Sequence, residues 1–346
     1  SLGNSPDPLD LIEKYGADGV RMGMMLSAPA GNDILFDDAL CEQGRNFCNK
    51  IWNAFRLVQG WRVDDQKPVP EASRLAADWF ESRQNEVAAE VADLFSKYRL
   101  SEALMAVYKL FWDEFSSWYL EIIKPAYGEG IPSSIHDCTL RFFDNLLHLL
   151  HPFMPFITEE IWQHLYDRTE EEIAGRQASL MVDRITIDTV VYKDLLTRFE
   201  TVKEVISNIR SIRLQKNIAQ KEALELQVIG ENPVAAFNAV ITKMCNLSSI
   251  NIVENKADGA ASFMVGTTEY AVPLGNMIDV EAEIARMEAE LKHKEGFLQG
   301  VLKKLGNEKF VNNAPAAVLE MERKKQADAE SIIKSLKESI AALKKA

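Results

Sequence analysis

Two runs of heptad spacing in residues 278–346 constrain the fold more than any other feature of the sequence. Mostly apolar side chains alternate four- and three-residue steps from Val280 to Leu305 and again from Leu319 to Leu343, with a break at Gly306–Pro315. The polar positions in the two series are Lys294, Glu322 and Gln326. Such a pattern places the apolar residues on one seam of a helix, and that seam needs a helical partner. The sequence therefore predicts an antiparallel coiled-coil hairpin whose arms extend roughly 40 Å at 1.5 Å per residue.

Residues 37–180 predict a helical bundle. Apolar positions from Phe47 to Val58 keep to one face of a long helix that ends at Gly60. Further helices are expected over Leu75–Tyr98, over Ser101–Tyr127, up to His151 and from about Thr158. Short connections between long helices favour antiparallel neighbours. The aromatic side chains of residues 101–127 are expected to form the core of this bundle.

Residues 181–277 have a different character. A helix over Lys193–Leu214 and another over Val234–Cys245 are expected among strand-like runs at Ala223–Ile229, Ile250–Val253 and Phe263–Pro273. Residues 1–36 indicate a turn followed by short helices. The fold class is therefore mainly α, in four parts: residues 1–36, a helical bundle at 37–180, a small α/β unit at 181–277, and the hairpin at 278–346.

The charge balance limits the function classes. The chain has 39 Lys and Arg against 52 Asp and Glu, a net charge of −13. This disfavours a uniformly basic nucleic-acid-binding module, because phosphates attract Lys and Arg, but it allows local basic patches. The sequence contains no run of eighteen apolar residues, so it predicts no membrane-spanning helix. The cysteines are few and form no CxxC pair, which indicates a reducing, cytoplasmic compartment.

Two helical stripes are candidates for contacts with nucleic acid. Guanidinium and amide groups pair with base edges and phosphates, and they recur at steps of four, four and three in the first long helix, at Arg45, Asn49, Asn53 and Arg56. A second stripe at steps of three contains Arg210, Arg213 and Lys216. Both patterns are also typical of an ordinary solvated helix face, which spacing alone favours, and the two interpretations stay open.

The tip of the predicted hairpin is a third candidate. Six cations lie within a few helical turns of its loop: Lys303, Lys304, Lys309, Arg323, Lys324 and Lys325. The nearby carboxylates of Glu308, Glu320 and Glu322 are not expected to cancel them. A positive tip on a long arm suits a phosphate surface, although charges flanking a coiled coil can also be purely structural.

Neither a catalytic centre nor a metal site is predicted. His148 and His151 are three residues apart, but no carboxylate or cysteine stands at ligand spacing beside them. The sequence has no G-x-S-x-G or P-loop run. We therefore expect no cofactor and no metal in this chain.

Several segments together resemble class I aminoacyl-tRNA synthetases. Ser1-Leu2-Gly3-Asn4 followed by Asp7–Gly16 resembles the end of the KMSKS loop, with Ser1 as the last residue of that motif. Gly16–Arg21 is similar to the motif G-A-D-A-L-R, with Gly19 in place of Ala, a change expected to loosen the helix slightly. Gly44–Ala54 and Leu150–Trp162 resemble the anticodon-binding domains of valyl, isoleucyl and leucyl enzymes.

The C-terminal segment narrows the resemblance to the valyl group. Leu305–Pro315, followed by a charged helix, is similar to the coiled-coil hairpin of valyl enzymes. The resemblance implies that the full enzyme activates valine with ATP and Mg and charges tRNA(Val). It also implies that the catalytic and editing centres lie before Ser1, and that this chain binds the anticodon stem-loop and the outer corner of tRNA.

The partner predictions follow from the same resemblance. We expect a cytoplasmic monomer that binds tRNA(Val), contacts neither DNA nor membrane, and meets valine and ATP only through a catalytic domain that this chain lacks. The isolated chain is expected to show no aminoacylation. Two alternatives stay open: the equivalent part of an isoleucyl or leucyl enzyme, and a non-catalytic RNA-binding or coiled-coil scaffold.

Overall fold

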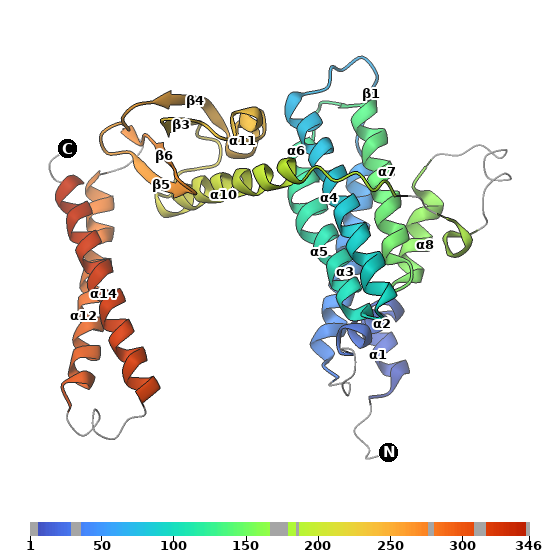
Figure 1. Cartoon of the computed structure of the whole chain (residues 1–346), viewed down its shortest axis with the longest axis horizontal. Coiled ribbons are helices and arrows are strands. Elements are labelled where there is room, and N and C mark those ends of the chain that lie inside the picture. Colours follow the sequence, from blue (N-terminus) through green and yellow to red (C-terminus); the bar gives the residue numbers. More distant parts are fainter. Residues whose placement is uncertain are drawn as a thin grey trace. The chain divides into compact units, whose positions relative to one another are not determined.

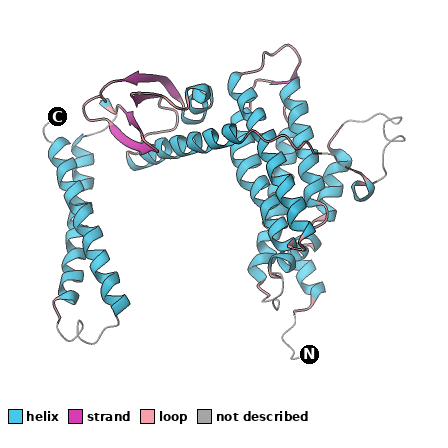
Figure 2. Ribbon diagram, viewed as in Figure 1, coloured by secondary structure: helices cyan, strands magenta, loops and turns pink. Residues whose placement is uncertain are grey.

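The computed structural model describes residues 6–28, 36–166, 179–184, 187–275, 280–307 and 316–343. The chain divides into two compact units. The first contains residues 1–203 and 234–244, and the second contains residues 204–233 and 245–346. The described part of the first unit is almost entirely helical, whereas the second contains a four-stranded sheet and a long helical hairpin (Figure 2).

The first unit is a helical bundle, as predicted. Its helices are α1 (Pro8–Tyr15), α2 (Ala17–Leu26), α3 (Asp38–Gln59), α4 (Glu71–Ser96), α5 (Leu100–Lys109), the π-helix η1 (Leu110–Tyr119), α6 (Leu120–Ile123), α7 (Ser133–Leu150), α8 (Pro155–His164), the 3₁₀ turns η2 (Leu180–Val182) and η3 (Ala235–Phe237), and α11 (Asn238–Cys245). α1 and α2 lie at one end of the bundle (Figure 1). The two-residue strands β1 (Val63–Asp64) and β2 (Ile131–Pro132) pair in parallel at the other end.

The aromatic segment expected as one helix over residues 101–127 is only partly core, since Phe111, Phe115 and Tyr119 are buried while Tyr108, Trp112 and Trp118 are half-buried. The segment is also not one regular helix. It runs from α5 through the ten-residue η1 into α6, which ends at Ile123. The residue before a proline disfavours helical geometry, so the helix stops ahead of Pro125. Seven side chains contributed by α3, α4, η1 and α7 are fully buried and form the aromatic core: Phe47, Phe80, Phe111, Phe115, Tyr119, Phe142 and Phe143.

Glycines set the close contact between α2 and α3. A Cβ built on Gly23 would lie 2.5 Å from Cys41 Sγ, and one on Gly44 would lie 2.5 Å from the carbonyl oxygen of Gly19. Real Cβ atoms do not approach this closely, so the two backbones meet only because these side chains are absent. Gly19 belongs to the same contact, since its Cβ would lie 3.1 Å from Arg45 N. This packing fixes α1 and α2 to the bundle.

Helix α10 (Lys193–Gln215) contributes to both units. Its first half is held in the first unit by Lys203, whose Nζ lies 2.6 Å from Glu114 Oε2 and 5.1 Å from the ring centre of Trp79. Phe199 stacks on Trp79 with ring centres 4.0 Å apart. The two compact units therefore divide inside α10, whereas the sequence analysis placed a boundary between residues 180 and 181.

The sheet of the second unit has the strand order β4-β3-β6-β5. Its strands are β3 (Leu224–Ile229), β4 (Leu247–Val253), β5 (Ala261–Val265) and β6 (Thr268–Val272). β3 runs parallel to β4 and antiparallel to β6, and β5 and β6 form a hairpin. Gly266 has φ +57 at the hairpin turn, a conformation that glycine adopts without a steric penalty. The predicted strands and turn are confirmed.

The coiled-coil hairpin is also confirmed. α12 (Val280–Leu305) and α14 (Ala316–Leu343) pack along the predicted apolar seam. The buried residues of the seam include Met287, Val301, Ala329, Ile333 and Ile340. Lys337 Nζ and Glu295 Oε1 form an ion pair across the two helices at 2.8 Å. None of the described helices is both long and apolar enough to cross a membrane.

Candidate nucleic-acid interface

The α3 stripe is presented as expected. Asp37 caps the helix by accepting a hydrogen bond from Ala39 N at 2.9 Å, which fixes where the helical phase begins. With Phe47, Ile51 and Val58 fully buried, the side chains on the other face point outward. Four of these are exposed polar residues: Arg45, Asn49, Asn53 and Arg56. They form the α3 stripe, an array of donors that runs along one helix.

Arg45, at one end of the α3 stripe, already has partners in the fold. Arg45 lies 3.7 Å from Glu42 Oε1, and its guanidinium lies 5.9 Å from the ring centre of Tyr15. This cation is therefore partly neutralised and held near α1. Beside the stripe, Lys50 Nζ lies 5.3 Å from the ring centre of half-buried Trp112. Lys50 and Trp112 lie on different helices, α3 and η1, so no spacing in the sequence indicated that they are in contact. The sequence analysis therefore missed this basic and aromatic pair.

The second predicted stripe is divided by burial. Arg210 is exposed, but Arg213 is only 2% exposed. The Arg213 guanidinium donates to the carbonyl oxygens of Ala219 at 2.9 Å, Glu222 at 2.8 Å and Cys245 at 2.7 Å. The expectation that Arg213 lies on an exposed basic face is therefore incorrect. Through these hydrogen bonds the guanidinium holds the loop after α10 against the start of β4. The Arg213 side chain is therefore not available to a phosphate.

The hairpin tip keeps part of its expected positive charge. Lys303, Lys304, Arg323 and Lys324 are exposed, and Lys325 is half-buried. The expectation that nearby carboxylates do not compensate these cations is wrong for two of them, because Glu322 lies 2.7 Å from Lys325 and 3.9 Å from Lys304. The hydrogen bond from Lys325 lowers the pKa of Glu322 below its usual range. Ser1 and Lys309 lie outside the described residues.

Three exposed cations remain at the tip after this pairing. Within the described residues no ion pair is recorded for Lys303, Arg323 or Lys324, which we call the tip cations. Lys303 lies in the last turn of α12, and Arg323 and Lys324 lie in the third turn of α14. Because α12 and α14 are antiparallel, these turns are neighbours at the same end of the hairpin. This end can present a compact positive surface to an anion.

A clasp joins α2 to the turn between α7 and α8. The Asp18 carboxylate accepts from Ile157 N at 2.7 Å and Phe156 N at 3.4 Å, and so caps α8, whose own N-cap residue Met154 supplies no side-chain bond. Arg21 donates to the carbonyl oxygen of Phe153 at 3.0 Å. Burial raises the pKa of Asp18, and the two N–H donors oppose that shift. The acid and base three residues apart were the sequence signal for this clasp.

No cluster in the described residues combines three or more potential metal-ligating side chains. His148 and His151 serve the bundle instead. His151 Nδ1 lies 2.8 Å from Thr158 Oγ1, and His148 Nε2 lies 3.3 Å from Asp183 Oδ2. The arrangement offers cationic and amide donors on helix faces, which suits recognition of a polyanion.

Two known protein families match parts of the chain. Residues 77–228 match a family described as the anticodon-binding domain of tRNA ligase, and residues 279–344 match one described as the valyl tRNA synthetase tRNA binding arm. The chain is 80% identical over all of its length to valine–tRNA ligase of Bacteroides thetaiotaomicron and 74% identical to that of Phocaeicola vulgatus. Over its whole length, the chain matches the C-terminal part of valine–tRNA ligases. The resemblance to the valyl group is thereby confirmed.

The valine–tRNA ligase relationship extends to distant relatives. The enzyme of Fusobacterium nucleatum is 34% identical over 98% of the chain. The chain spans 39% of the length of the Bacteroides thetaiotaomicron ligase, and it corresponds to the C-terminal part of that protein. The matched arm coincides with α12 and α14, whereas the anticodon-binding match begins within α4 and leaves the α3 stripe outside it.

Proposed function

We propose that this chain binds tRNA as the C-terminal part of a valine–tRNA ligase. The observation that carries the proposal is the coincidence of the matched tRNA-binding arm, residues 279–344, with a hairpin whose end presents three exposed cations. A net charge of −13 on the whole chain makes this local positive surface more selective, because the rest of the protein repels a polyanion.

The two candidate surfaces have different chemistry. The tip cations are point charges on an exposed helix end, which suits contacts with backbone phosphates at the outer corner of tRNA. The α3 stripe alternates guanidinium and amide groups, which suits the unstacked bases and phosphates of the anticodon stem-loop. This division assigns position along the tRNA to the hairpin and base recognition to the bundle.

The remaining proposals rest on the names of the full-length relatives and on the sequence pattern. We propose tRNA(Val) as the RNA, with valine and ATP with Mg bound by the part of the ligase that precedes this segment. The chain acts as a monomer in the cytoplasm, with no role in binding DNA or a membrane. No aminoacylation is expected from this chain alone.

A binding experiment at two salt concentrations tests the proposal. Unmodified tRNA(Val) is titrated with the chain, with isoleucine tRNA as the competitor class. Arg56→Ala is expected to weaken binding by about 1–3 kcal/mol and to reduce the salt slope by about one. Asn53→Ala is expected to weaken binding without changing the slope, because it carries no charge.

Arg74→Ala is a matched control, since Arg74 is also an exposed helical arginine but is paired with Asp78 at 3.1 Å on α4. Its affinity for tRNA should match that of the unchanged chain. Failure of tRNA(Val) to bind at low salt would contradict the proposal and favour a coiled-coil scaffold. Equal affinity for the two tRNAs would restrict it to general tRNA binding.

A further inference from the structure

Glu322 is a buried carboxylate in the seam between the two helices of the hairpin. Its residue is only 6% exposed, whereas other buried residues of the seam, such as Val301, Ala329 and Ile333, are apolar. A polar seam residue can fix the register of two helices at a cost in stability, and a well-packed apolar side chain in place of a buried charge is often neutral or stabilising. Packing of the seam alone therefore gives no reason for a charge at this position.

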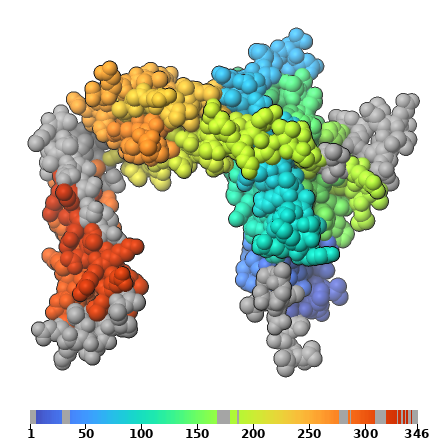
Figure 3. Space-filling view, viewed as in Figure 1, coloured from blue at the N-terminus to red at the C-terminus, as the bar shows by residue number. Residues whose placement is uncertain are grey.

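The Glu322 carboxylate holds one lysine from each helix of the hairpin. Its Oε1 accepts a hydrogen bond from Lys325 Nζ at 2.7 Å, and its Oε2 lies 3.9 Å from Lys304 Nζ on α12. The hydrogen bond from Lys325 lowers the pKa of Glu322, so the carboxylate is charged at neutral pH. The side chains of Lys325 and Lys304 are nevertheless 42% and 62% exposed. They belong to α14 and α12, which form the orange and red arm of the space-filling view (Figure 3).

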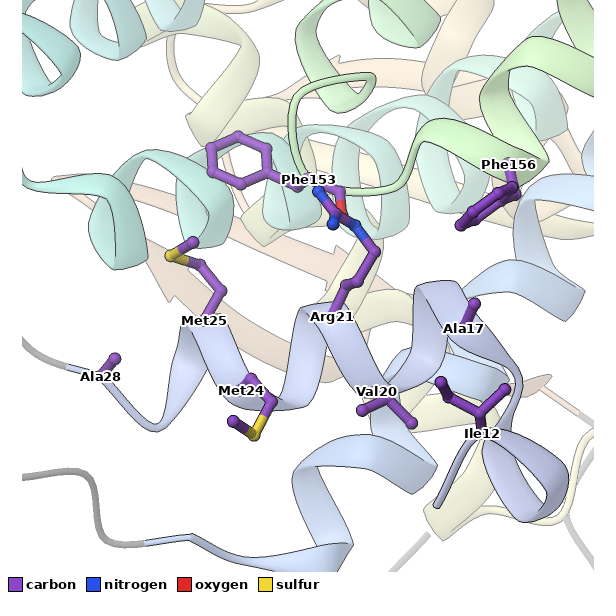
Figure 4. Close-up of a pocket in the computed structure, with 9 residues that line it drawn as sticks. All are labelled: Ile12, Ala17, Val20, Arg21, Met24, Met25, Ala28, Phe153 and Phe156. Carbon is purple, nitrogen blue, oxygen red and sulfur yellow. The ribbon is translucent and has the colours of Figure 1, made fainter. Parts of the chain in front are cut away.

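A carboxylate acts on a cation differently from a backbone carbonyl. Arg21 extends from α2 toward Phe153 (Figure 4) and donates to the carbonyl oxygen of that residue at 3.0 Å. A carbonyl has no net charge, so it orients the guanidinium and leaves the positive charge in place. Glu322 instead brings a full negative charge close to two ammonium groups. It therefore weakens the attraction of Lys304 and Lys325 for any further anion.

We propose that Glu322 is a specificity-determining residue of the hairpin, which withholds Lys304 and Lys325 from RNA phosphates and confines the contact to the tip cations. The inference rests on the proposed binding of tRNA. Each cation that meets a phosphate adds affinity that does not depend on the sequence of the RNA. With Glu322 in place, two of the five described cations near the tip are neutralised. An RNA that lacks the shape of tRNA therefore gains less from the hairpin.

Glu322→Gln tests the proposal, because it removes the charge and keeps the size of the side chain. The whole chain and the variant are titrated with tRNA(Val) and with an RNA duplex of similar length, at about 50 mM and about 200 mM salt. Each phosphate contact contributes about 0.9 to the salt slope, which is a factor of about 3.5 in affinity across this range. The ratio of the two duplex affinities should rise about 3.5-fold if one lysine meets a phosphate and about 12-fold if both do.

The duplex should gain more affinity than tRNA(Val) in this variant. On tRNA the contacts of the rest of the chain fix where the tip lies, whereas on a duplex the tip can bind wherever its cations meet phosphates. The preference of the chain for tRNA(Val) over the duplex should therefore fall in Glu322→Gln. A carboxylate that only fixed the register of the hairpin would leave duplex binding no stronger than before.

Glu295→Gln is the matched control. Glu295 on α12 pairs with Lys337 on α14 at 2.8 Å. Its substitution changes the net charge by the same amount and releases a lysine of the same hairpin, but neither residue belongs to the group of cations around Glu322. The duplex affinity and the salt slope of this variant should stay close to those of the unchanged chain. A gain that arose only from a less negative protein would appear in both variants.

Glu322→Leu separates the charge from the packing of the seam. Leucine makes the seam apolar at this position and should stabilise the pairing of α12 with α14, which slower hydrogen exchange in these helices would show. Duplex binding should have the same stronger salt dependence as in Glu322→Gln. The leucine variant would then combine a more stable hairpin with less selective binding, a result that a structural role for Glu322 does not produce.

Three results would overturn the inference. Equal salt slopes for Glu322→Gln and Glu295→Gln would show that Lys304 and Lys325 gain no specific contact. Weaker binding of both RNAs by Glu322→Gln, with faster hydrogen exchange in the hairpin, would assign the carboxylate to register alone. If the unchanged chain binds tRNA(Val), either result refutes the role of Glu322 and leaves the proposed function intact. A chain and variants that bind neither RNA would refute both.

Discussion

Substitution of Arg213 by alanine should destabilise the second unit without weakening contact with RNA. The side chain makes three short charged hydrogen bonds to backbone carbonyls, at 2.7 to 2.9 Å. Each such bond contributes about 1.5–3 kcal/mol, but burial of the guanidinium offsets much of the sum. Ala219 and Glu222 are exposed and their carbonyls can rehydrate, whereas Cys245 is buried. The expected net loss in the free energy of unfolding is about 3 kcal/mol.

Two probes locate the effect. The tryptophans are residues 52, 61, 79, 112, 118 and 162, and all belong to the first unit, so tryptophan fluorescence follows that unit during urea unfolding. Hydrogen exchange of β3 and β4 follows the sheet. A loss of about 3 kcal/mol corresponds to exchange about 150 times faster, because 1.4 kcal/mol is a factor of ten. The fluorescence transition should stay where it is.

Two further variants are controls. Gln215→Ala, at an exposed position of the same helix, should change stability by less than about 0.5 kcal/mol. Arg213→Lys should recover little, because an ammonium group cannot reproduce the fork of a guanidinium. The reasoning is refuted by an Arg213→Ala variant with unchanged exchange in β3 and β4, or by one that keeps its stability and loses tRNA affinity.

Three other predictions concern the packing, the pH dependence and the hairpin. Gly44→Ala should destabilise the first unit by about 1–3 kcal/mol in a urea titration, because its Cβ would meet the Gly19 backbone, and an unchanged midpoint would contradict this. Burial alone would lower the pKa of His148, but its bonds to Asp144 and Asp183 outweigh burial and raise it. The resulting stabilisation is present below about pH 6.5 and is lost as pH rises through the raised pKa, so thermal stability should fall there, and His148→Gln should flatten the profile. A variant that combines Lys303→Glu, Arg323→Glu and Lys324→Glu reverses the charge of the tip cations. It should reduce the salt slope of tRNA binding by about one for each phosphate that the hairpin no longer neutralises. Its thermal melt should not change, and an unchanged salt slope would remove the tip from the interface.

Periodicity alone predicted much of the architecture. The heptads of residues 278–346 required a second helix to cover each seam, and the break at Gly306–Pro315 allowed that helix to come from the same chain. The four-residue spacing from Phe47 to Val58 likewise fixed which face of α3 is buried, and therefore that Arg45, Asn49, Asn53 and Arg56 lie on the outside. These are local properties, since a helix with one apolar stripe has only one way to face a core.

Long-range contacts could not be predicted in this way. Nothing near Arg213 in sequence indicates that carbonyls of residues 222 and 245 converge on it, because that convergence arises from the pairing of β3 with β4. Glu322 captures Lys304 across the hairpin only because the two helices adopt one register. The π-helical turns of η1 arise inside a segment whose composition is typical of an ordinary helix.

The sequence by itself therefore determined the helical bundle and the hairpin, because each is encoded by spacing within one segment. Its motifs, spread over several segments, carried the resemblance to valyl enzymes. Tertiary structure decided which charges remain available to RNA, because desolvation and pairing depend on partners far away in the chain. It withdrew Arg213 into the second unit and reduced the hairpin end to Lys303, Arg323 and Lys324. It also left Ile12 and Met24 exposed, where the sequence predicted only short helices.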